Sequence, residues 1–290
     1  MTFVGARPQF IKAAPVSRAL REVGVEETIV HTGQHYDRMM SAVFFEDLGL
    51  EPPACNLAVG SVSHGRMTAR ILEGSEDLLL RTHPSWVLVY GDTNSTLGSA
   101  LAAAKLNIPV AHVEAGLRSF RRDMPEEINR VVTDHLATLL FAPSQAAVKL
   151  LKQEGIEEGV ELVGDVMLDA TLQHLQRGQA RSFPAASLPQ PYALATLHRQ
   201  ENVDSREALT SLLTALGALP YPVVLPLHPR TAKRVEEFGL KDLLCSGAIQ
   251  VREPVSYLEM LVLLSRAQLV LTDSGGLQKE AFFLRIPCVT

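Results

Sequence analysis

Short apolar runs, each followed by a polar or glycine turn and then a helical segment, repeat along the chain. Residues 82–90 end in a strand, residues 92–106 form a helix with polar caps, and residues 108–113 form the next strand. Repeated β-α units predict a mostly parallel, doubly wound α/β sheet. A second series of such units begins later in the chain, so we expect two domains, residues 1–164 and 165–290.

The composition narrows the class of protein. The chain has 290 residues, of which 47% are hydrophobic and 20% charged, and its net charge is −5. This is an ordinary globular balance, which gives no general reason to expect a nucleic-acid partner. Three widely spaced cysteines predict neither a disulfide framework nor a zinc site, and they fit a reduced, cytosolic setting.

Several targeting and cofactor signals are missing from the sequence. The first residues do not have the pattern of a signal peptide, so none is expected, and no apolar run is long enough to cross a bilayer. Neither a GxGxxG fingerprint nor a GxxxxGK[ST] loop is found, so no dinucleotide cofactor is expected. His31 and His35 have a spacing that can bind a metal, but without a third ligand no metal is expected.

Two strand-to-helix turns have features of anion sites. The first is GARPQFIK at residues 5–12, which carries Arg7 and Lys12, and the second is DSGG at residues 273–276. Helix N-termini favour anions, and glycine lets a phosphate approach the backbone closely. Glycine turns also occur for geometry alone, so both interpretations stay open here. If both turns bind anions, two domains facing each other across a cleft would hold a diphosphate.

Three acidic residues stand where chemistry is expected in such a sheet. Asp92 and Glu114 each follow a short apolar strand, and Glu126 comes shortly afterwards. Ligands bind at the carboxyl ends of the strands in open α/β sheets. Two carboxylates at that edge, with a third close behind, therefore indicate proton-transfer chemistry.

Each of these acids also has a structural interpretation. Asp92 could cap the following helix, and Glu114 could be a solvated loop acid. Glu126 has the spacing of a capping box with Asp123 and an i,i+4 spacing with Arg130. On spacing alone, the structural interpretation is the stronger one for Glu126.

Basic residues follow strands in the second half. His198 and Arg199 come after the strand ALATL, and a His-Arg pair there suits phosphate oxygens and a leaving-group proton. His228 follows the strand VVLPL in the same way, which makes it a candidate for substrate binding. Either histidine could instead be an ordinary hydrogen-bonded loop residue.

These segments together resemble the non-hydrolysing UDP-N-acetylglucosamine 2-epimerase family. The matching text covers essentially the whole chain in order: GARPQFIKAAP, HTGQHYD, RILEG, VLVYGDTNSTL, HVEAGLRS, PEEINR, LVGDVMLDA, TLHRQEN, LPLHPR and LTDSGGLQKEA. The resemblance implies two Rossmann-like domains of the glycosyltransferase-B kind, with the active site in the cleft between them. It also implies a homodimer.

By motif position, the resemblance implies roles for individual residues. The catalytic set is Asp92, Glu114, Glu126 and His198. The substrate-binding set is Arg7, Lys12, Arg130, Arg199, Ser274, Gly275, Gly276 and Glu280. Within the second set, the Ser-Gly-Gly turn would bind the diphosphate, and Glu280 would bind the ribose hydroxyls.

The chain departs from the common family pattern in places. Gln9 stands where the common form has glutamate, and Tyr36 and Asp37 differ from many bacterial members in a segment that forms an activating UDP-sugar site there. GARPQFIKA, VLPLHPRT, PVSYLEM and QKEAFF are closer to the branch that epimerises UDP-2,3-diacetamido-2,3-dideoxyglucuronic acid. Family members continue beyond Thr290, so we expect the second domain to be incomplete.

The family's reaction explains why several acids and cations are needed. Loss of UDP from C1 makes the C2 proton removable, and the resulting 2-acetamidoglucal takes UDP back with protonation on the other face. No redox cofactor is involved. A glycosyltransferase of the same fold group and a non-catalytic UDP-sugar sensor are the alternatives to an epimerase.

Overall fold

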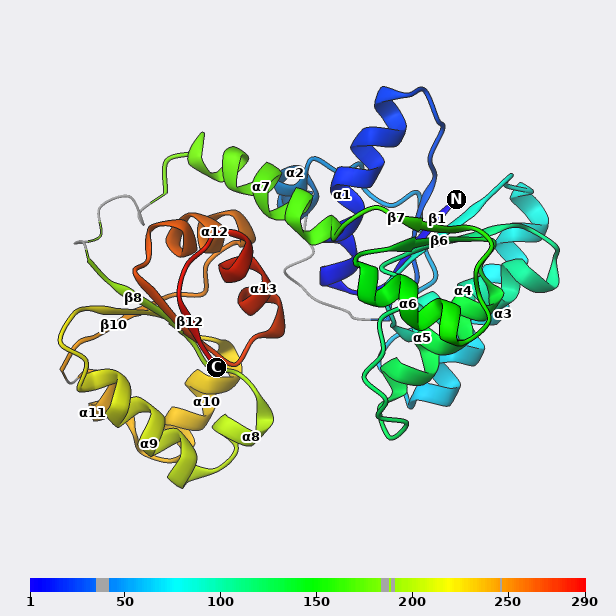
Figure 1. The fold of residues 1–290 in the computed structure, drawn as a ribbon. Helices are drawn as coiled ribbons and strands as arrows, with labels where there is room; N and C mark the ends of the chain where they lie inside the picture. The colour runs from blue at the N-terminus through cyan, green and yellow to red at the C-terminus, as the bar shows by residue number, and fades with distance from the viewer. Residues whose placement is uncertain (35–41, 184–187, 189–190, 246) are drawn as a thin grey trace. The chain divides into compact units, whose positions relative to one another are not determined.

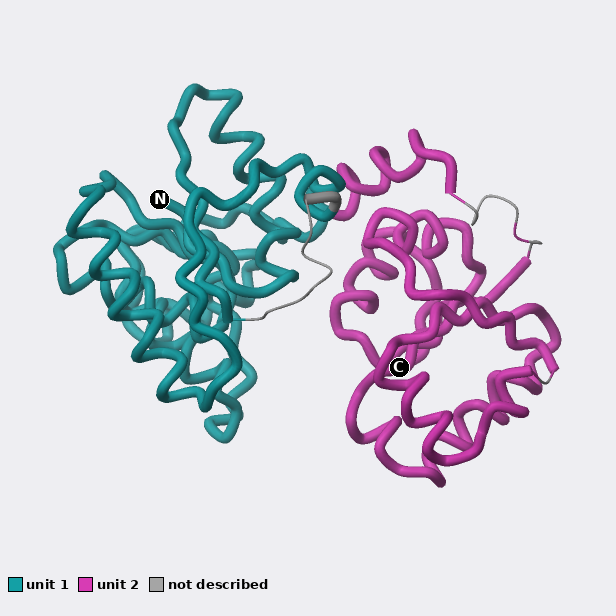
Figure 2. The backbone as a smooth tube through the Cα atoms, turned by 180° about the vertical axis from the view of Figure 1, so that it is seen from behind, with its two compact units in different colours: residues 1–170 teal, residues 171–290 magenta. Residues whose placement is uncertain are grey.

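The chain divides into two compact units, residues 1–170 and residues 171–290 (Figure 2). The computed structural model describes all residues except 35–41, 184–187, 189–190 and 246. The predicted boundary at Gly164 precedes this division, and one helix runs across it. None of the helices in the described part of the chain combines the length and the apolar character that crossing a membrane requires.

Unit 1 is a seven-stranded sheet with helices between its strands (Figure 1). Its elements are β1 (Thr2–Val4), α1 (Arg7–Glu22), β2 (Ile29–His31), α2 (Ala42–Leu48), β3 (Cys55–Asn56), α3 (His64–Thr82), β4 (Val87–Tyr90), α4 (Asn94–Lys105), β5 (Val110–Val113), α5 (Pro125–Leu136), β6 (Leu139–Ala142), α6 (Gln145–Gln153), β7 (Val160–Leu162) and α7 (Val166–Gln179), which continues into unit 2.

The strand order of unit 1 is β3-β2-β1-β4-β5-β6-β7, and every pairing among these strands is parallel. The chain builds outward from β1 in one direction and then in the other, so the order reverses between β1 and β4. In doubly wound sheets, this switch point is where the strand ends diverge and a ligand crevice forms. The first site residues of unit 1 follow these two strands.

Burial on both faces explains the apolar strands of unit 1. Phe3, Val87 and Val89 are fully buried, and they pack against small residues of α4 and leucines of α3. Alanines in α4, including Ala100 and Ala103, let that helix lie close to the strands. On another part of the unit, Phe10 of α1 packs edge-on against aromatic residues of α2.

Unit 2 repeats the architecture with five strands in the order β10-β9-β8-β11-β12, again with parallel pairings. The switch point lies between β8 and β11. Its elements are β8 (Ala193–Thr196), α8 (Gln200–Val203), α9 (Arg206–Gly217), β9 (Val223–Pro226), α10 (Pro229–Glu237), α11 (Lys241–Leu244), β10 (Ile249–Arg252), α12 (Tyr257–Arg266), β11 (Leu269–Thr272), α13 (Gly275–Phe283) and β12 (Cys288–Val289).

Candidate active site

In unit 1, the carboxylates predicted from the sequence lie at the carboxyl ends of β4 and β5. Asp92 follows β4 by two residues, and Glu114 comes directly after β5. Residues 5–12 lie at the end of β1, which pairs with β4. The topology therefore brings the basic turn and two acids to one edge of the sheet, as expected for a ligand site.

Glu114 is a buried acid with a cationic partner. Its side chain is 9% exposed, and its carboxylate accepts a hydrogen bond from the Lys12 ammonium group. The backbone of Glu114 is in the left-handed region at φ 73°, which is uncommon for a residue with a long side chain. The alternative of a solvated loop acid is wrong, and Lys12 and Glu114, which the sequence analysis named separately as site residues, are in direct contact.

Asp92 is paired with Arg130, whose guanidinium also bonds to Glu127. The cap of α4 is Thr93, whose hydroxyl accepts a hydrogen bond from the Thr96 amide at 3.3 Å. The alternative role of Asp92 as the helix cap is therefore wrong. Its carboxylate remains about one-third exposed, so it can reach a ligand while Arg130 holds it.

Glu127 fixes the loop that precedes α5. Its carboxylate accepts hydrogen bonds from the Ser119 amide, the Ser119 hydroxyl and the Phe120 amide at 2.8–2.9 Å. Burial raises the pKa of Glu127, but these bonds and the charge of Arg130 outweigh it and lower the pKa overall. The ionised form of Glu127 is thus favoured, and its carboxylate orients Arg130 toward Asp92.

Glu126 is not part of a capping box. Helix α5 is capped at Met124 with Pro125 as its first residue, and Asp123 instead forms an ion pair with Arg121. Arg130 contacts other acids, so the expected i,i+4 pair is also wrong. Among the described residues, the Glu126 carboxylate has no hydrogen-bond or ion-pair partner. Glu126 is partly exposed, and it directly precedes Glu127, whose carboxylate pairs with Arg130.

The anion site predicted at the start of α1 is corrected in part. The amides of Gly5 and Ala6 both donate to the Gln9 side chain, at 2.8 and 3.1 Å, so neither is open to an anion. Gly5 is needed for packing, because a Cβ there would lie 2.0 Å from the Ser95 hydroxyl. The guanidinium of Arg7 lies 5.5 Å from the centre of the Phe44 ring.

In unit 2, the basic residues surround an aspartate at the switch point. His198 and Arg199 follow β8, and Asp273 follows β11. Asp273 accepts hydrogen bonds from both of these backbone amides and from Asn202, and its carboxylate lies 2.9 Å from His198 Nδ1. Burial raises the pKa of Asp273, but these donors outweigh it and hold the pKa below its ordinary value.

Two imidazoles lie together at this edge. The ring centroids of His198 and His228 are 5.4 Å apart. His228 Nδ1 accepts a hydrogen bond from the Arg230 amide at 3.2 Å, so His228 caps α10. Burial and the nearby His198 lower the pKa of His228. A neutral ring with its proton on Nε2 is thus favoured for His228, whereas Asp273 orients His198.

The start of α13 has the open glycines that the start of α1 lacks. Its cap is Ser274, whose hydroxyl accepts from the Leu277 amide. A Cβ at Gly275 would come no closer than 4.0 Å to Arg199, and one at Gly276 no closer than 3.9 Å to Ser274. Neither glycine is required by a positive φ or by packing within the described chain. Their first-turn amides have no intrahelical acceptors and suit an anion.

The remaining predicted residues differ in how the structure places them. Glu280 is buried on α13 and accepts a hydrogen bond from the Tyr257 hydroxyl at 2.9 Å. The ribose-binding role predicted for it stays a prediction. His35, Tyr36 and Asp37 lie outside the described residues.

Sequence reasoning missed the polar residues that support the unit 1 turns. Asn129 donates to the Asp92 carbonyl at 3.0 Å. His112, on β5, lies between the Gly91 carbonyl and Asp134, at 2.7 Å from each. A histidine inside an otherwise apolar buried strand was the available signal, because a buried polar group requires partners.

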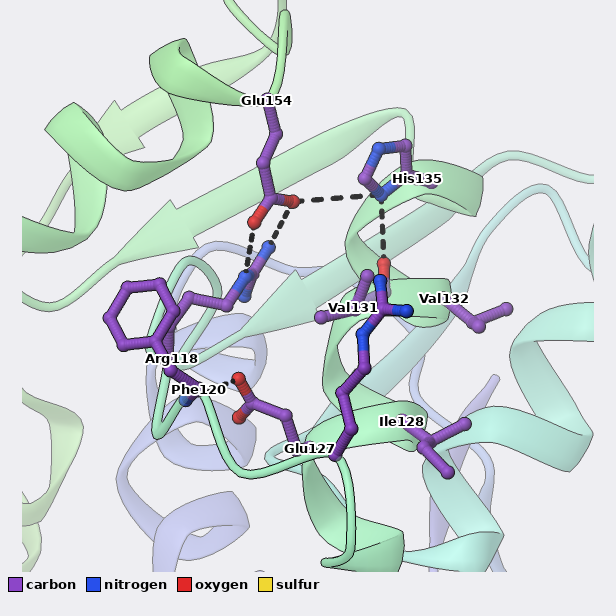
Figure 3. Close-up of a pocket in the computed structure, with 9 residues that line it drawn as sticks. Arg118, Phe120, Glu127, Ile128, Val131, Val132, His135 and Glu154 are labelled. Carbon is purple, nitrogen blue, oxygen red and sulfur yellow. Dashed lines mark hydrogen bonds and ion pairs between the residues drawn. The ribbon is translucent and has the colours of Figure 1, made fainter.

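A hollow of about 830 Å³ adjoins this network on the outer side of α5 (Figure 3). Figure 3 shows Arg118 paired with Glu154, and His135 within reach of the same carboxylate. Phe120 and Ile128 also line the hollow and expose 75% and 51% of their surface.

Comparison with known proteins gives a consistent result. A family model described as UDP-N-acetylglucosamine 2-epimerase matches residues 18–290. A Pseudomonas aeruginosa protein named UDP-2,3-diacetamido-2,3-dideoxy-D-glucuronate 2-epimerase is 52% identical over 100% of this chain and 82% of its own length. A Methanococcus maripaludis protein named UDP-N-acetylglucosamine 2-epimerase homolog is 49% identical with the same coverage.

Solved structures agree with these relatives. The Methanocaldococcus jannaschii UDP-GlcNAc 2-epimerase, crystallised with UDP-GlcNAc and UDP, is 46% identical and has a TM-score of 0.85 over 99% of this chain and 82% of its own. MurG from Acinetobacter baumannii, at 14% identity and a TM-score of 0.53, shares the fold alone, over 98% of this chain and 75% of its own. The predicted fold class, two doubly wound parallel-sheet domains of the glycosyltransferase-B kind, is confirmed.

Proposed function

Because this chain belongs to the UDP-N-acetylglucosamine 2-epimerase family, we propose that it inverts C2 of UDP-N-acetylglucosamine to give UDP-N-acetylmannosamine. The observation that carries the proposal is the arrangement at the switch point of unit 1. Two acids, Asp92 and Glu114, are each held by a cation there. Glu126, for which the described part of the chain offers no hydrogen-bond or ion-pair partner, stands on the same helix as Arg130.

The reaction proceeds by elimination and re-addition. A carboxylate takes the proton from C2, the C1–O bond breaks with its electron pair going to the β-phosphate of UDP, and a C1=C2 double bond forms. UDP oxygen then adds back to C1 while C2 receives a proton on the opposite face. Asp92, Glu114 and Glu126 share these proton steps, each of which typically contributes about 10²–10⁴-fold in rate.

The cations of unit 1 have a second task, because they order the acids before substrate arrives. Lys12 and Arg130 each hold one catalytic carboxylate in place. Arg7 is a further positive charge at the start of α1. Pre-set charges of this kind stabilise a developing charge without reorganising during the reaction.

Unit 2 supplies the groups for the UDP that leaves and returns. The open amides of Gly275 and Gly276, the Ser274 hydroxyl and the Arg199 guanidinium bind the diphosphate. His198 uses Nδ1 for Asp273, which leaves Nε2 to donate to the departing phosphate oxygen. His228 supplies a second imidazole beside it, and Glu280 binds the ribose hydroxyls.

Deuterium incorporation tests this function. The protein is incubated with UDP-N-acetylglucosamine in D₂O, and deuterium at C2 with formation of the manno product is expected. Asp92→Asn, Glu114→Gln and Glu126→Gln should each lower turnover by about 10²-fold or more. Near-normal turnover in all three variants contradicts the assignment.

A matched control exists for Glu126→Gln. Glu207 is also the second residue of a helix, α9, and it is exposed. Glu207→Gln removes the same charge from the same helix position and should leave turnover unchanged. UDP release only with an acceptor sugar would instead indicate a glycosyltransferase, and binding without exchange would indicate a sensor.

A second substrate is favoured by a specific observation. The relative named as acting on UDP-2,3-diacetamido-2,3-dideoxy-D-glucuronate is 52% identical to this chain. The same chemistry on that sugar is therefore the alternative function. Parallel D₂O incubations with both sugars compare kcat/KM, and the sugar with the larger value is the substrate.

We place the enzyme in the cytoplasm as a homodimer. The free thiols of Cys55, Cys245 and Cys288 support a reducing compartment. The dimer is supported by the family resemblance, and sedimentation of the chain at twice its 31.6 kDa mass tests it. A monomer at micromolar concentration contradicts the dimer.

A further inference from the structure

One polar pair lies in the core of unit 1, behind the catalytic edge. His112 on β5 and Asp134 on α5 both have fully buried side chains. His112 Nε2 lies 2.7 Å from the Gly91 carbonyl oxygen, and His112 Nδ1 lies 2.7 Å from Asp134 Oδ1. The proposed function assigns neither residue a task.

The hydrogen-bond partners determine which atoms carry protons. A carbonyl oxygen only accepts, so His112 Nε2 must donate to Gly91. The second oxygen of Asp134 accepts from the Gly116 amide at 3.1 Å and from the positively charged Arg118 at 2.6 Å, and this cation favours the ionised form of Asp134. An ionised carboxylate also only accepts, and Nδ1 of His112 must therefore donate too. Both ring nitrogens then carry protons.

The charge balance of the cluster fits this protonation state. Burial raises the pKa of Asp134, but the hydrogen bond and charge of His112 and the nearby Arg118 outweigh burial and lower the pKa overall. Arg118 also pairs with Glu154 (Figure 3). A histidine cation and Arg118 thus face two carboxylates, and buried charges are tolerated when they are paired in this way.

The pair connects the two turns that carry catalytic acids. Through His112 it holds the carbonyl of Gly91, the residue before Asp92. Through Asp134 it holds the amide of Gly116, two residues after Glu114. Since Glu114 has a strained φ of 73°, its turn requires such support from the surrounding structure.

We infer that His112, as a buried imidazolium, and Asp134 form a positioning pair that sets the two carboxylate turns in the geometry needed for proton transfer. The inference rests on the proposed function, because it concerns the placement of Asp92 and Glu114. It adds a protonation state and a task for residues that do not touch the sugar.

The first test measures protonation in the wild-type protein. Nuclear magnetic resonance of histidine labelled with ¹⁵N should show one ring, absent from His112→Gln, with both nitrogens protonated at about pH 8. An unperturbed imidazole is neutral at that pH. A His112 ring with one protonated nitrogen overturns the inference, and this result does not depend on any activity or on the folding of Asp134→Asn.

The second test separates positioning from stability. Asp134→Asn keeps the shape but removes the charge, and kcat should fall about 10²-fold, as expected for a misplaced reacting group. KM should change by less than about threefold, because the groups that bind UDP are untouched. The control is Ser75→Ala, which breaks a buried 3.0 Å hydrogen bond between the α3 and α4 hydroxyls of Ser75 and Ser99.

The outcomes of the second test are distinguishable. All measurements are made where circular dichroism shows the variants folded. If Asp134→Asn turns over within about twofold of Ser75→Ala, the positioning role is refuted. If wild-type protein exchanges no deuterium, the proposed function fails, while the resonance experiment still decides the protonation of His112.

Discussion

A methyl group at Gly276 should stabilise the protein and weaken its binding of UDP. The site is the second residue of α13, where the nearest atom to an added Cβ is the Ser274 hydroxyl at 3.9 Å, an ordinary contact. No positive φ opposes the change. Gly276→Ala should therefore raise the free energy of unfolding by about 0.5 kcal/mol, because alanine restricts the unfolded chain.

The same methyl group should obstruct the phosphate. If an oxygen of UDP approaches the first-turn amides, a Cβ at Gly276 forces it away and weakens two or more hydrogen bonds. We expect Kd for UDP to rise at least tenfold, which corresponds to about 1.4 kcal/mol. A rise in stability together with weaker UDP binding would identify a local effect on the phosphate site, because a variant that merely damages the fold lowers both stability and affinity.

Titration calorimetry with UDP and thermal unfolding measure the two effects. Gly65 offers a matched control, because it is the second residue of α3 and an added Cβ meets nothing within 4 Å of it in the described chain. Gly65→Ala should gain similar stability and bind UDP like the wild type. Unchanged UDP affinity in Gly276→Ala refutes the argument that these glycines are present for a phosphate.

Three further variants test other parts of the structure. Gln9→Leu removes hydrogen bonds to two backbone amides and to the Tyr90 carbonyl, so chemical denaturation should show that the free energy of unfolding falls by about 2–4 kcal/mol. A fall of less than about 1 kcal/mol would contradict the importance of these bonds. Arg130→Lys cannot bridge two carboxylates, so kcat should fall at least about tenfold in the D₂O assay, and full activity would show that bridging is unimportant. Because the pKa of Asp273 is lowered in the folded state, its carboxylate stabilises the fold above the unfolded pKa of about 3.9, and this contribution is lost as the pH falls through the folded-state pKa. The urea midpoint should therefore fall more steeply below about pH 4 in the wild type than in Asp273→Asn. The same dependence of the midpoint on pH in both proteins would contradict the lowered pKa.

The edge of each sheet that carries the site was predictable, because an apolar run shows where a strand ends. Asp92, Glu114, His198 and Asp273 all follow such runs, and the parallel order places those ends together. The partners were not predictable by the same means. Lys12 is 102 residues from Glu114, and their contact depends on the pairing of β1 with β4 and of β4 with β5.

The error at Glu126 came from placing a helix start one residue too early. Asp123 and Glu126 have the spacing of a capping box, but Pro125 occupies the first helical position, which makes Met124 the cap. A proline at that position is favoured because its missing amide donor costs nothing there. The shift leaves the Glu126 side chain without a capping task, which strengthens the case for a chemical one.

Similar sequence patterns at two turns have different physical causes. At Gly5 a side chain is excluded by Ser95 and Thr32, whose hydroxyls would lie 2.0 and 2.3 Å from a Cβ, and the local amides are already bound by Gln9. At Gly276 the nearest atom would lie 3.9 Å from a Cβ, so packing among the residues that the structure describes does not explain the glycine. Such a glycine costs helix stability relative to alanine; the proposed diphosphate gives the open space at Gly276 a use, whereas no ligand is proposed at the equally open Gly65. Of the two turns, the one in unit 2 has the open first-turn amides that the proposed diphosphate site requires, whereas the Gly5 and Ala6 amides of unit 1 are bound by Gln9.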